Sequence, residues 1–248
     1  MKEFWLDWGK WKLKPKNDWK EKAKRTAALE AVKHVRDGFI VGLGSGSTAA
    51  YAIAEIGRKI REEEIEVLGI PTSTQAFYLA IRHGIPLTTL DEHPTIDLTI
   101  DGADQIDKNL NLIKGMGGAL TREKIVASCS KKVIIVADET KLVEKLGGNH
   151  PIPIEVIPFA VSHVISEINK LGGKPKLRET NGKVGPVITD NGNYILDVTF
   201  EQTENLTELN RKLKLITGVV ETGLFLGMAD EAYLGKKDGD LIKLSRNH

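Results

Sequence analysis

Two aspartates near the middle of the chain are spaced closely enough to act on one substrate. Asp101 and Asp104 stand three residues apart, directly after the apolar, β-branched segment 97–100. Close carboxylates in a partly dry cleft push each other's pKa values apart, and this difference equips a site for acid and base catalysis. A turn capped by one aspartate, with its neighbour in solvent, explains the same spacing. On these two residues alone the turn is the favoured interpretation.

A lysine and a glutamate further along form the second chemical group. Lys114 begins a glycine-containing loop, and Glu123 follows early in a predicted helix over 119–130. A lysine stabilises the oxyanion that forms when a carbonyl is enolised, and a glutamate removes the neighbouring carbon-bound proton. The alternative is a surface cation followed by a first-turn carboxylate that interacts with the helix dipole. The helix by itself does not decide between these interpretations.

The loop over residues 42–48 has the composition of a phosphate-binding loop. Its glycines allow close approach of the backbone and its hydroxyls add donors; these residues are Gly42, Gly44, Ser45, Gly46, Ser47 and Thr48. The loop enters a predicted helix, whose N-terminal N–H groups and dipole favour an anion. A glycine-rich turn with a serine cap explains this loop equally well. The hydroxyl-rich loop 71–76, after another predicted strand, tilts the balance toward a phosphorylated, polyhydroxylated ligand.

Other chemistries of glycine loops need residues that this loop lacks. A dinucleotide-binding fingerprint requires a third glycine where Ser47 stands, and a Walker loop requires a lysine before Ser47 or Thr48. A nucleotide-dependent oxidoreductase is therefore a weak alternative. The single cysteine, Cys129, and the six histidines show no metal-ligand spacing. We expect neither a metal site nor a cofactor.

Short apolar strands that alternate with helices must position these loops. The predicted strands cover 39–41, 65–70, 97–100, 111–113 and 133–136, and the predicted helices cover 18–36, 48–60, 74–83 and 119–130. This alternation is typical of an α/β fold with a mostly parallel, Rossmann-like sheet and helices on both faces. Such sheets bind ligands at the carboxyl ends of their strands. The polar loops described above all fall at that edge.

The pattern changes after Gly147. The elements predicted from there are a strand over 152–156, a helix over 159–171, a strand over 176–179, a strand pair within 187–199, a helix over 204–216 and a strand over 219–225. This β-α-β-β-α-β order is that of a ferredoxin-like α+β module. We therefore divide the chain into an extension (1–20), an α/β catalytic domain (21–146 and 229–248) and a smaller ferredoxin-like domain (147–228) inserted before the C-terminal segment.

The composition argues against several classes of partner. The 35 basic and 34 acidic side chains leave a net charge of +1, which provides no field to attract nucleic acid. No segment has the length of a membrane span or the pattern of a signal peptide, and one cysteine suits a reducing compartment. We therefore expect a cytoplasmic protein with no membrane contact. The four tryptophans of the extension, interleaved with lysines, are expected to pack on the body or on a neighbouring subunit, with stacking on nucleic acid as the weaker alternative.

Three segments resemble, in order and spacing, the signature motifs of the type A ribose-5-phosphate isomerase family. They are GLGSGSTAA at 42–50, DGAD at 101–104 and KGMGGALTREK at 114–124. Further matches are Ala137 and Asp138 with Lys141, residues 154–158 and residues 189–197. The resemblance extends from about residue 22 to the end, and several motifs in the right order argue against chance. It implies the same two-domain plan as the pattern of elements.

The resemblance also implies an activity and its residues. The reaction is the interconversion of D-ribose 5-phosphate and D-ribulose 5-phosphate through an enediolate, a step of the non-oxidative pentose phosphate pathway, without metal or cofactor. Glu123 shuttles a proton between C1 and C2, and Lys114 stabilises the enediolate. Asp101 assists ring opening and hydroxyl proton transfer, and Asp104 is the second family aspartate. The implied substrate contacts are Ser45, Gly46, Ser47 and Thr48, to which the phosphate is assigned, and Gly102, Ala103, Gly115, Met116, Gly117 and Lys141.

Two residues depart from the family pattern. Met116 stands in a loop that is often all glycine, and Gln105 follows Asp104 where glutamate is usual. These changes bear on specificity, and they remove no proposed catalytic group. The family's early substrate-contacting lysine aligns with Lys22 or Lys24, and the sequence does not choose between them. The resemblance further implies a homodimer or homotetramer, and a sugar-phosphate sensor without catalysis is an alternative on the same scaffold.

Overall fold

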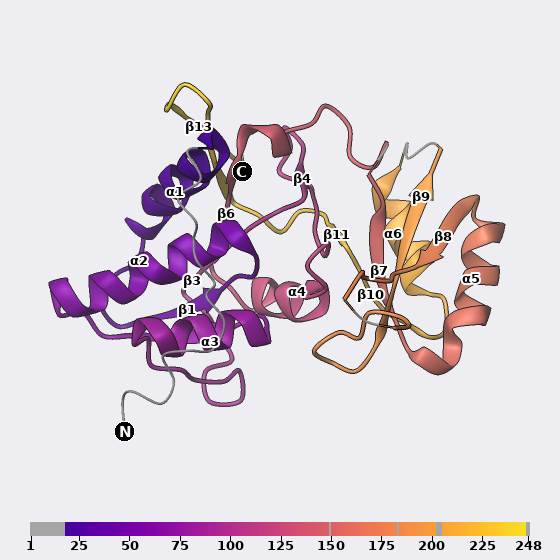
Figure 1. Cartoon of the computed structure of the whole chain (residues 1–248), viewed down its shortest axis with the longest axis horizontal. Helices are drawn as coiled ribbons and strands as arrows, with labels where there is room; N and C mark the ends of the chain where they lie inside the picture. Colours follow the sequence, from indigo (N-terminus) through magenta and orange to yellow (C-terminus); the bar gives the residue numbers. More distant parts are fainter. Residues whose placement is uncertain (1–17, 149, 183, 202–204, 247–248) are drawn as a thin grey trace.

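The chain forms two lobes around two separate sheets, as Figure 1 shows. The computed structural model describes residues 18–148, 150–182, 184–201 and 205–246. The larger lobe holds a six-stranded sheet and the smaller lobe a four-stranded sheet, and a three-stranded sheet lies between them. Of the predicted N-terminal extension, residues 1–17 lie outside the described part, and the remainder belongs to the first helix and its cap.

The six-stranded sheet has the order β13-β12-β6-β3-β1-β2, and its neighbours are parallel except for the β12–β13 hairpin. Its strands are β1 (Phe39–Leu43), β2 (Val67–Pro71), β3 (Leu98–Asp101), β6 (Val133–Asp138), β12 (Glu231–Gly235) and β13 (Leu241–Ser245). Burial between two layers of helices requires apolar residues on both faces of such strands. The predicted mostly parallel, Rossmann-like sheet is confirmed, and the C-terminal tail returns to it.

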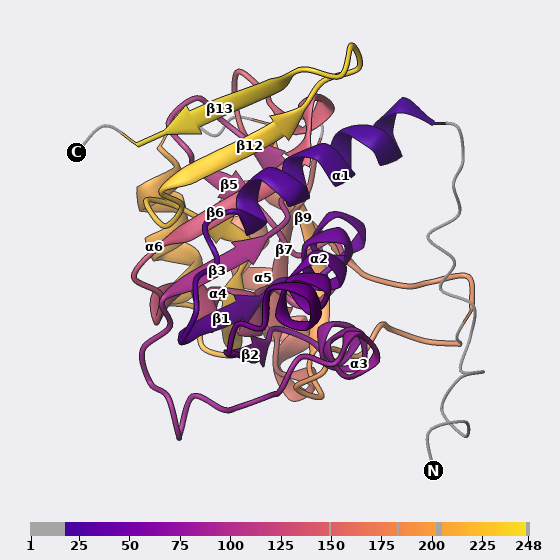
Figure 2. The same cartoon turned by 90° about the vertical axis from the view of Figure 1, so that its left-hand side faces the viewer.

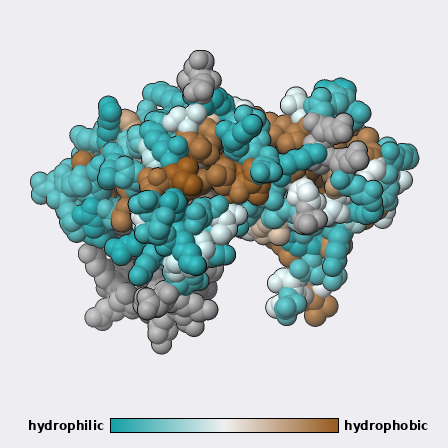
Figure 3. Space-filling model, turned by 90° about the horizontal axis from the view of Figure 1, so that it is seen from above, coloured by the Kyte–Doolittle hydropathy of each residue, from teal (hydrophilic) through white to brown (hydrophobic). Residues whose placement is uncertain are grey.

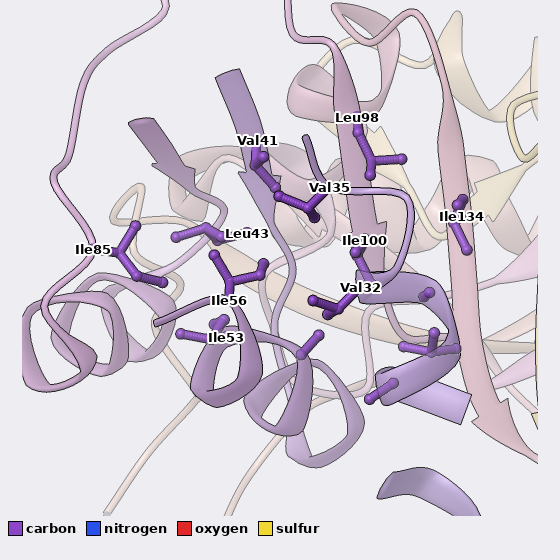
Figure 4. Packing of buried hydrophobic residues seen from close by; sticks show 14 of the residues in the cluster. Val32, Val35, Val41, Leu43, Ile53, Ile56, Ile85, Leu98, Ile100 and Ile134 are labelled. Carbon is purple, nitrogen blue, oxygen red and sulfur yellow. The ribbon is translucent and has the colours of Figure 1, made fainter. Parts of the chain in front are cut away.

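Helices cover both faces of this sheet, with α1, α2 and α3 on one face and α4 on the other (Figure 2). They are α1 (Trp19–Val32), α2 (Ser47–Glu63), α3 (Thr74–His83) and α4 (Leu120–Ser128). Successive side chains of a strand point to opposite faces of the sheet. Leu98 and Ile100 join the cluster under α1 and α2 that Figure 4 shows, whereas the Thr99 hydroxyl hydrogen-bonds Ser130 behind α4.

Helix α1 ends earlier than the predicted helix over 18–36. After Val32, the N–H groups of His34 and Val35 bond to carbonyls three residues back, so the last turn tightens and the helix stops. Val35 remains buried in the cluster of Figure 4 although it lies outside the helix. The apolar spacing therefore predicted the burial of Val35 correctly, although the helix itself ends at Val32.

The order of the parallel strands creates a crevice at their carboxyl ends. From β1 the chain moves to β2 on one side and then returns to β3 on the other side of β1. The connections that follow β1 and β3 therefore diverge, and the crevice between them is where open α/β sheets bind ligands. Residues 44–46 and 102–104 follow these two strands and reach this crevice.

The smaller lobe has the predicted ferredoxin-like order. Its sheet runs β10-β7-β9-β8 and is antiparallel throughout. The elements are β7 (Ile152–Val156), α5 (Val161–Lys170), β8 (Gly173–Leu177), β9 (Tyr194–Phe200), α6 (Leu206–Lys214) and β10 (Val219–Thr222). Both helices contribute to one hydrophobic cluster with the strands.

The predicted strand pair within 187–199 is wrong in its first half. Only β9 is a strand there, whereas residues 187–193 form a turn outside the sheet. Three side chains of this turn donate hydrogen bonds to Oε1 of the buried Glu155; they are Thr189, Asn191 and Asn193. Val187 donates its backbone N–H to the Arg178 carbonyl, and β9 pairs with β7 and β8 instead. In Figure 2 the segment before β9 (orange) extends past the ends of the large sheet's strands.

The predicted strand over 219–225 is split between two sheets. Its second part belongs to the three-stranded sheet of β4 (Gln105–Ile106), β5 (Leu112–Ile113) and β11 (Leu224–Phe225). Gly223, at the division, donates its N–H to the Pro153 carbonyl and accepts a hydrogen bond from Lys114 N. A Cβ at position 223 would lie 2.3 Å from the Lys114 carbonyl oxygen, so only glycine fits. This contact holds Lys114 at the boundary of the lobes.

The surface of the molecule is mostly polar in the view of Figure 3. Polar side chains (teal) cover most of the face in Figure 3, and apolar side chains (brown) gather near its middle. Within the described ranges, no helix is long and apolar enough to cross a membrane.

Candidate active site

Lys114 stands at the centre of a buried group of charged side chains. Its Nζ lies 3.0 Å from Asp101 Oδ2 and 3.1 Å from Glu123 Oε1. It also donates a hydrogen bond of 2.5 Å to the Gly102 carbonyl. The three charged side chains are at most 6% exposed. They come from the end of β3, the loop after β5 and the first turn of α4, so the fold brings together residues that the sequence singled out.

Asp101 is held between Lys114 and the connection after β1. Its Oδ2 faces Lys114, and its Oδ1 accepts hydrogen bonds from the backbone N–H groups of Ser45 and Gly102 at 3.0 and 2.7 Å. The approach is close, because a Cβ at Gly44 would lie 2.3 Å from Asp101 Oδ1. Both carboxylate oxygens are thus occupied, and Asp101 does not line the cleft.

Asp104 has different surroundings from Asp101. Its Oδ2 accepts a hydrogen bond from Met116 N at 3.0 Å, and its side chain lines the cleft. Of the two aspartates, only Asp104 lines the cleft. The described part of the chain contains no group of three or more His, Cys, Asp or Glu side chains that could hold a metal ion.

Glu123 lines the cleft with a strongly perturbed carboxylate. Burial and, after it, the negative charge of Asp101 raise the pKa of Glu123 to about 8, against the opposing effect of Lys114. Its Oε2 is buried and has no hydrogen-bond partner among the described residues. A carboxylate with a pKa near neutrality and one free oxygen is suited to take up and return a proton.

Lys114 is the complementary cation. Burial disfavours its charged form, but the carboxylates of Asp101 and Glu123 outweigh burial and raise the pKa of Lys114 above its ordinary value. Lys114 therefore carries its positive charge at neutral pH. A cation fixed in a nearly dry site stabilises a developing oxyanion well, because no reorganisation is needed when the charge forms.

A cleft of about 440 Å³ opens beside this group. Both lobes contribute to it, because residues 187–190 of the smaller lobe face the connections of the larger lobe. The residues with a predicted role that line it are Ser45, Gly46, Ser47, Thr48, Gly102, Ala103, Asp104, Lys114, Gly115, Gly117, Glu123 and Lys141. Met116, a predicted substrate contact, does not line it, and its side chain is 43% exposed.

One part of the cleft has the features of an anion site. Gly46, with a φ of 93°, precedes the 17-residue helix α2, so Ser47 and Thr48 lie in the first turn of that helix. Lys24 Nζ lies 3.2 Å from Ser47 Oγ. Free N–H groups, hydroxyls, the helix dipole and an ammonium group together favour a bound anion.

The structure distinguishes the two lysines that the sequence left open. Lys24 lines the cleft, whereas Lys22 is exposed and does not line it. Glu21 holds Lys24 by an ion pair of 2.8 Å and itself accepts a hydrogen bond from Tyr51 at 2.7 Å. Lys20, one turn before Lys24, also lines the cleft. The first helix therefore contributes two cations to the cleft, of which Lys24 contacts the N-terminus of α2.

Other cleft residues were missing from the predicted set, in which Lys24 appeared only as one of two alternatives. Lys20 and Lys24 share a helix face at i, i+4 spacing, a signal that would have marked them as a pair. Asp138, the last residue of β6, and Thr140 also line the cleft. Residues 187–190 carry no local signal of a cleft position, because the packing of the other lobe places them there.

The sequence matches the model of the family ribose 5-phosphate isomerase A (phosphoriboisomerase A) over residues 68–239. The chain belongs to this family. Ribose-5-phosphate isomerase A of Methanococcus aeolicus is 50% identical over 213 residues, which cover 86% of this chain and 90% of that relative. The matched range of the family model includes the four predicted catalytic residues Asp101, Asp104, Lys114 and Glu123.

Solved structures of ribose 5-phosphate isomerases share the fold over about nine tenths of the chain. The structure of ribose 5-phosphate isomerase A from Methanocaldococcus jannaschii is similar with a TM-score of 0.86 and 48% identity, covering 90% of this chain and 97% of that chain. A D-ribose-5-phosphate isomerase in complex with phospho-erythronic acid has a TM-score of 0.88 and 45% identity, covering 92% of this chain and 99% of that chain. The two-lobed architecture is therefore that of the ribose 5-phosphate isomerase A family.

Proposed function

We propose that this protein interconverts ribose 5-phosphate and ribulose 5-phosphate. The observation that carries the proposal is the contact of 3.1 Å between Lys114 Nζ and Glu123 Oε1 beside the cleft. It pairs a fixed cation with a carboxylate whose pKa is about 8, as enolisation of a sugar requires. The names of the relatives and the phospho-erythronic acid bound by one of them support a phosphorylated, polyhydroxylated substrate.

In the proposed complex the phosphate binds at the N-terminus of α2, where Ser47, Thr48 and Lys24 are donors. The open-chain aldehyde then lies toward Lys114 and Glu123. Glu123 takes the proton from C2, the electron pair of that bond forms the C1–C2 double bond, and the carbonyl electrons move to O1. Lys114 stabilises the resulting enediolate. Transfer of the O2 hydroxyl proton to O1 and return of the Glu123 proton to C1 complete the ketose.

We assign different tasks to the two aspartates. The family resemblance implies ring opening and hydroxyl proton transfer for Asp101, yet both of its oxygens are occupied and it does not line the cleft. These contacts support a positioning role, in which Asp101 holds Lys114 and the connection after β1. Asp104 lines the cleft and is the better placed group for hydroxyl protons.

A time course by NMR with ribose 5-phosphate tests the function. With EDTA present, we expect the wild-type protein to form ribulose 5-phosphate, because the proposed steps use only side chains. The same experiment in deuterated water should place deuterium on the carbon that exchanges its proton with Glu123. Binding of the sugar without turnover and without exchange would contradict an isomerase and indicate a sensor.

Several expectations from the sequence stay predictions. They are the homodimer or homotetramer, the cytoplasmic location and the domain boundaries at residues 146–147 and 228–229. Light scattering on the full chain measures the oligomeric state. Cell fractionation tests the location, and limited proteolysis tests the domain boundaries. A monomer of the full chain would contradict the expected oligomer.

A further inference from the structure

Arg178 of the smaller lobe contacts the loop that carries Lys114. It follows β8, and its Nη1 donates hydrogen bonds to the carbonyl oxygens of Gly115 and Met116 at 2.8 and 3.0 Å. Its Nη2 also lies 3.7 Å from the Met116 sulfur. Arg178 does not line the cleft, so substrate binding does not account for these contacts.

Asp197 on β9 holds the opposite edge of the guanidinium. Arg178 Nε donates a hydrogen bond of 2.8 Å to Asp197 Oδ2, and Arg178 Nη2 donates to Oδ1. The two side chains are only 10% and 20% exposed. A bidentate pair of this kind fixes the plane of the guanidinium as well as its charge. Asp197 therefore directs Nη1 at the loop carbonyls.

The loop needs anchors of this kind because of its glycines. Gly115 and Gly118 have φ values of 105° and 80°, and a loop built on such residues has many accessible conformations when it is free. Asp104 of the larger lobe accepts a hydrogen bond from Met116 N, and Arg178 of the smaller lobe donates to Met116 O. The N–H of Met116 is thus bonded by a residue of the larger lobe, and its carbonyl by a residue of the smaller lobe.

We propose that Arg178 is a positioning residue of the isomerisation site. Through the loop 115–118 it keeps Lys114 at its distance of 3.1 Å from Glu123. The inference rests on the proposed function. A displacement of about 1 Å in a reacting group costs on the order of 10²-fold in rate. Loss of Arg178 should therefore lower kcat more than it raises KM, because the anion site at α2 does not contact Arg178, whereas Gly115 and Gly117 of the loop line the cleft.

Two variants and a matched control test the role of Arg178. Lys174→Ala is the control. Lys174 lies on β8, the strand that directly precedes Arg178, but it is 70% exposed and pairs with the exposed Glu201. For Arg178→Ala we expect kcat to fall about 10- to 100-fold and added methylguanidine to restore part of it. Arg178→Lys keeps a cation opposite Asp197 but loses the planar fork, so its kcat should be intermediate. Lys174→Ala should match the wild type.

A second readout does not depend on turnover. In ¹⁵N NMR spectra, the amide resonances of Gly115, Gly117 and Gly118 should shift in Arg178→Lys and stay in place in Lys174→Ala. Unchanged loop resonances, or an unchanged kcat in both Arg178 variants of an active enzyme, would overturn the inference. If the wild type shows no turnover while the loop resonances shift as expected, the positioning of the loop stands and the proposed function fails.

Discussion

Glu123 Oε1 lies 3.1 Å from Lys114 Nζ within a group of side chains that are almost fully buried. Burial and the charge of Asp101 raise the pKa of Glu123, and the charge of Lys114 lowers it. The balance, about 8, brings the proton affinity of this carboxylate close to the working pH of a cell. The contact with Lys114 positions the proposed base, and burial together with the charges of Asp101 and Lys114 sets its protonation.

Replacement of the proposed base tests its role directly. Glu123→Gln keeps the size of the side chain but cannot take a proton from carbon, so kcat should fall about 10²–10⁴-fold while ribose 5-phosphate still binds. The NMR time course and calorimetric titration measure the two quantities. Glu167→Gln is the control, because Glu167 pairs with Lys170 on the surface of α5, far from the cleft residues. Wild-type turnover in Glu123→Gln would remove Glu123 from the mechanism.

The pH dependence of kcat/KM should follow the ionisation of Glu123. Activity should rise with pH and level off above about 8, because only the ionised carboxylate accepts a proton. Asp101→Asn should move the inflection to lower pH, since the charge of Asp101 raises this pKa, and Lys114→Met should move it to higher pH, since Lys114 lowers it. Shifts in the same direction for both variants would contradict the assignment.

Lys24 should contribute to phosphate binding. A charged hydrogen bond is worth about 1.5–3 kcal/mol, so Lys24→Ala should raise KM for ribose 5-phosphate about tenfold to a hundredfold and weaken inhibition by inorganic phosphate. Lys22→Ala is the matched control, since Lys22 lies on the same helix but is exposed and outside the cleft. Equal KM values for the two variants would argue against the anion site at α2.

Lys124 should stabilise the junction between the lobes. Its Nζ donates hydrogen bonds to Glu221 Oε1 at 3.0 Å and to the carbonyls of Thr222 and Leu224 at 2.6 and 2.8 Å. Burial lowers the pKa of Lys124 to about 8, against the effect of Glu221. Lys124→Met leaves buried acceptors without a donor, so the free energy of unfolding should fall by about 2–4 kcal/mol.

Denaturant titrations measure this loss of stability. The control is Lys131→Met, because Lys131 is 65% exposed and pairs with Asp97 at the surface. Its effect should stay below about 1 kcal/mol, as is usual for exposed ion pairs. Similar losses in Lys124→Met and Lys131→Met would show that the buried contacts of Lys124 do not hold the junction.

Local patterns in the sequence were sufficient to predict the fold class and many of the residues that line the cleft. Strands that are apolar on both faces indicate a parallel sheet between helices, and the carboxyl ends of those strands locate the ligand. The motifs around Asp101, Lys114 and Glu123 could be singled out because their residue types and glycine spacing are properties of short segments. Their order along the chain then indicated the family to which the chain belongs.

The identity and order of the motif residues were thus determined by the sequence itself, whereas only the tertiary structure decided where these residues lie and what they contact. In the structure Lys24 lines the cleft and Lys22 does not. Asp101 is buried against Lys114 and does not line the cleft. Residues 187–190 of the smaller lobe lie at the cleft of the larger lobe. Each outcome depends on contacts between segments that are distant along the chain. The pKa of Glu123 has the same origin, because burial and the charges of two other segments set it, and none of these is a property of the helix that carries Glu123.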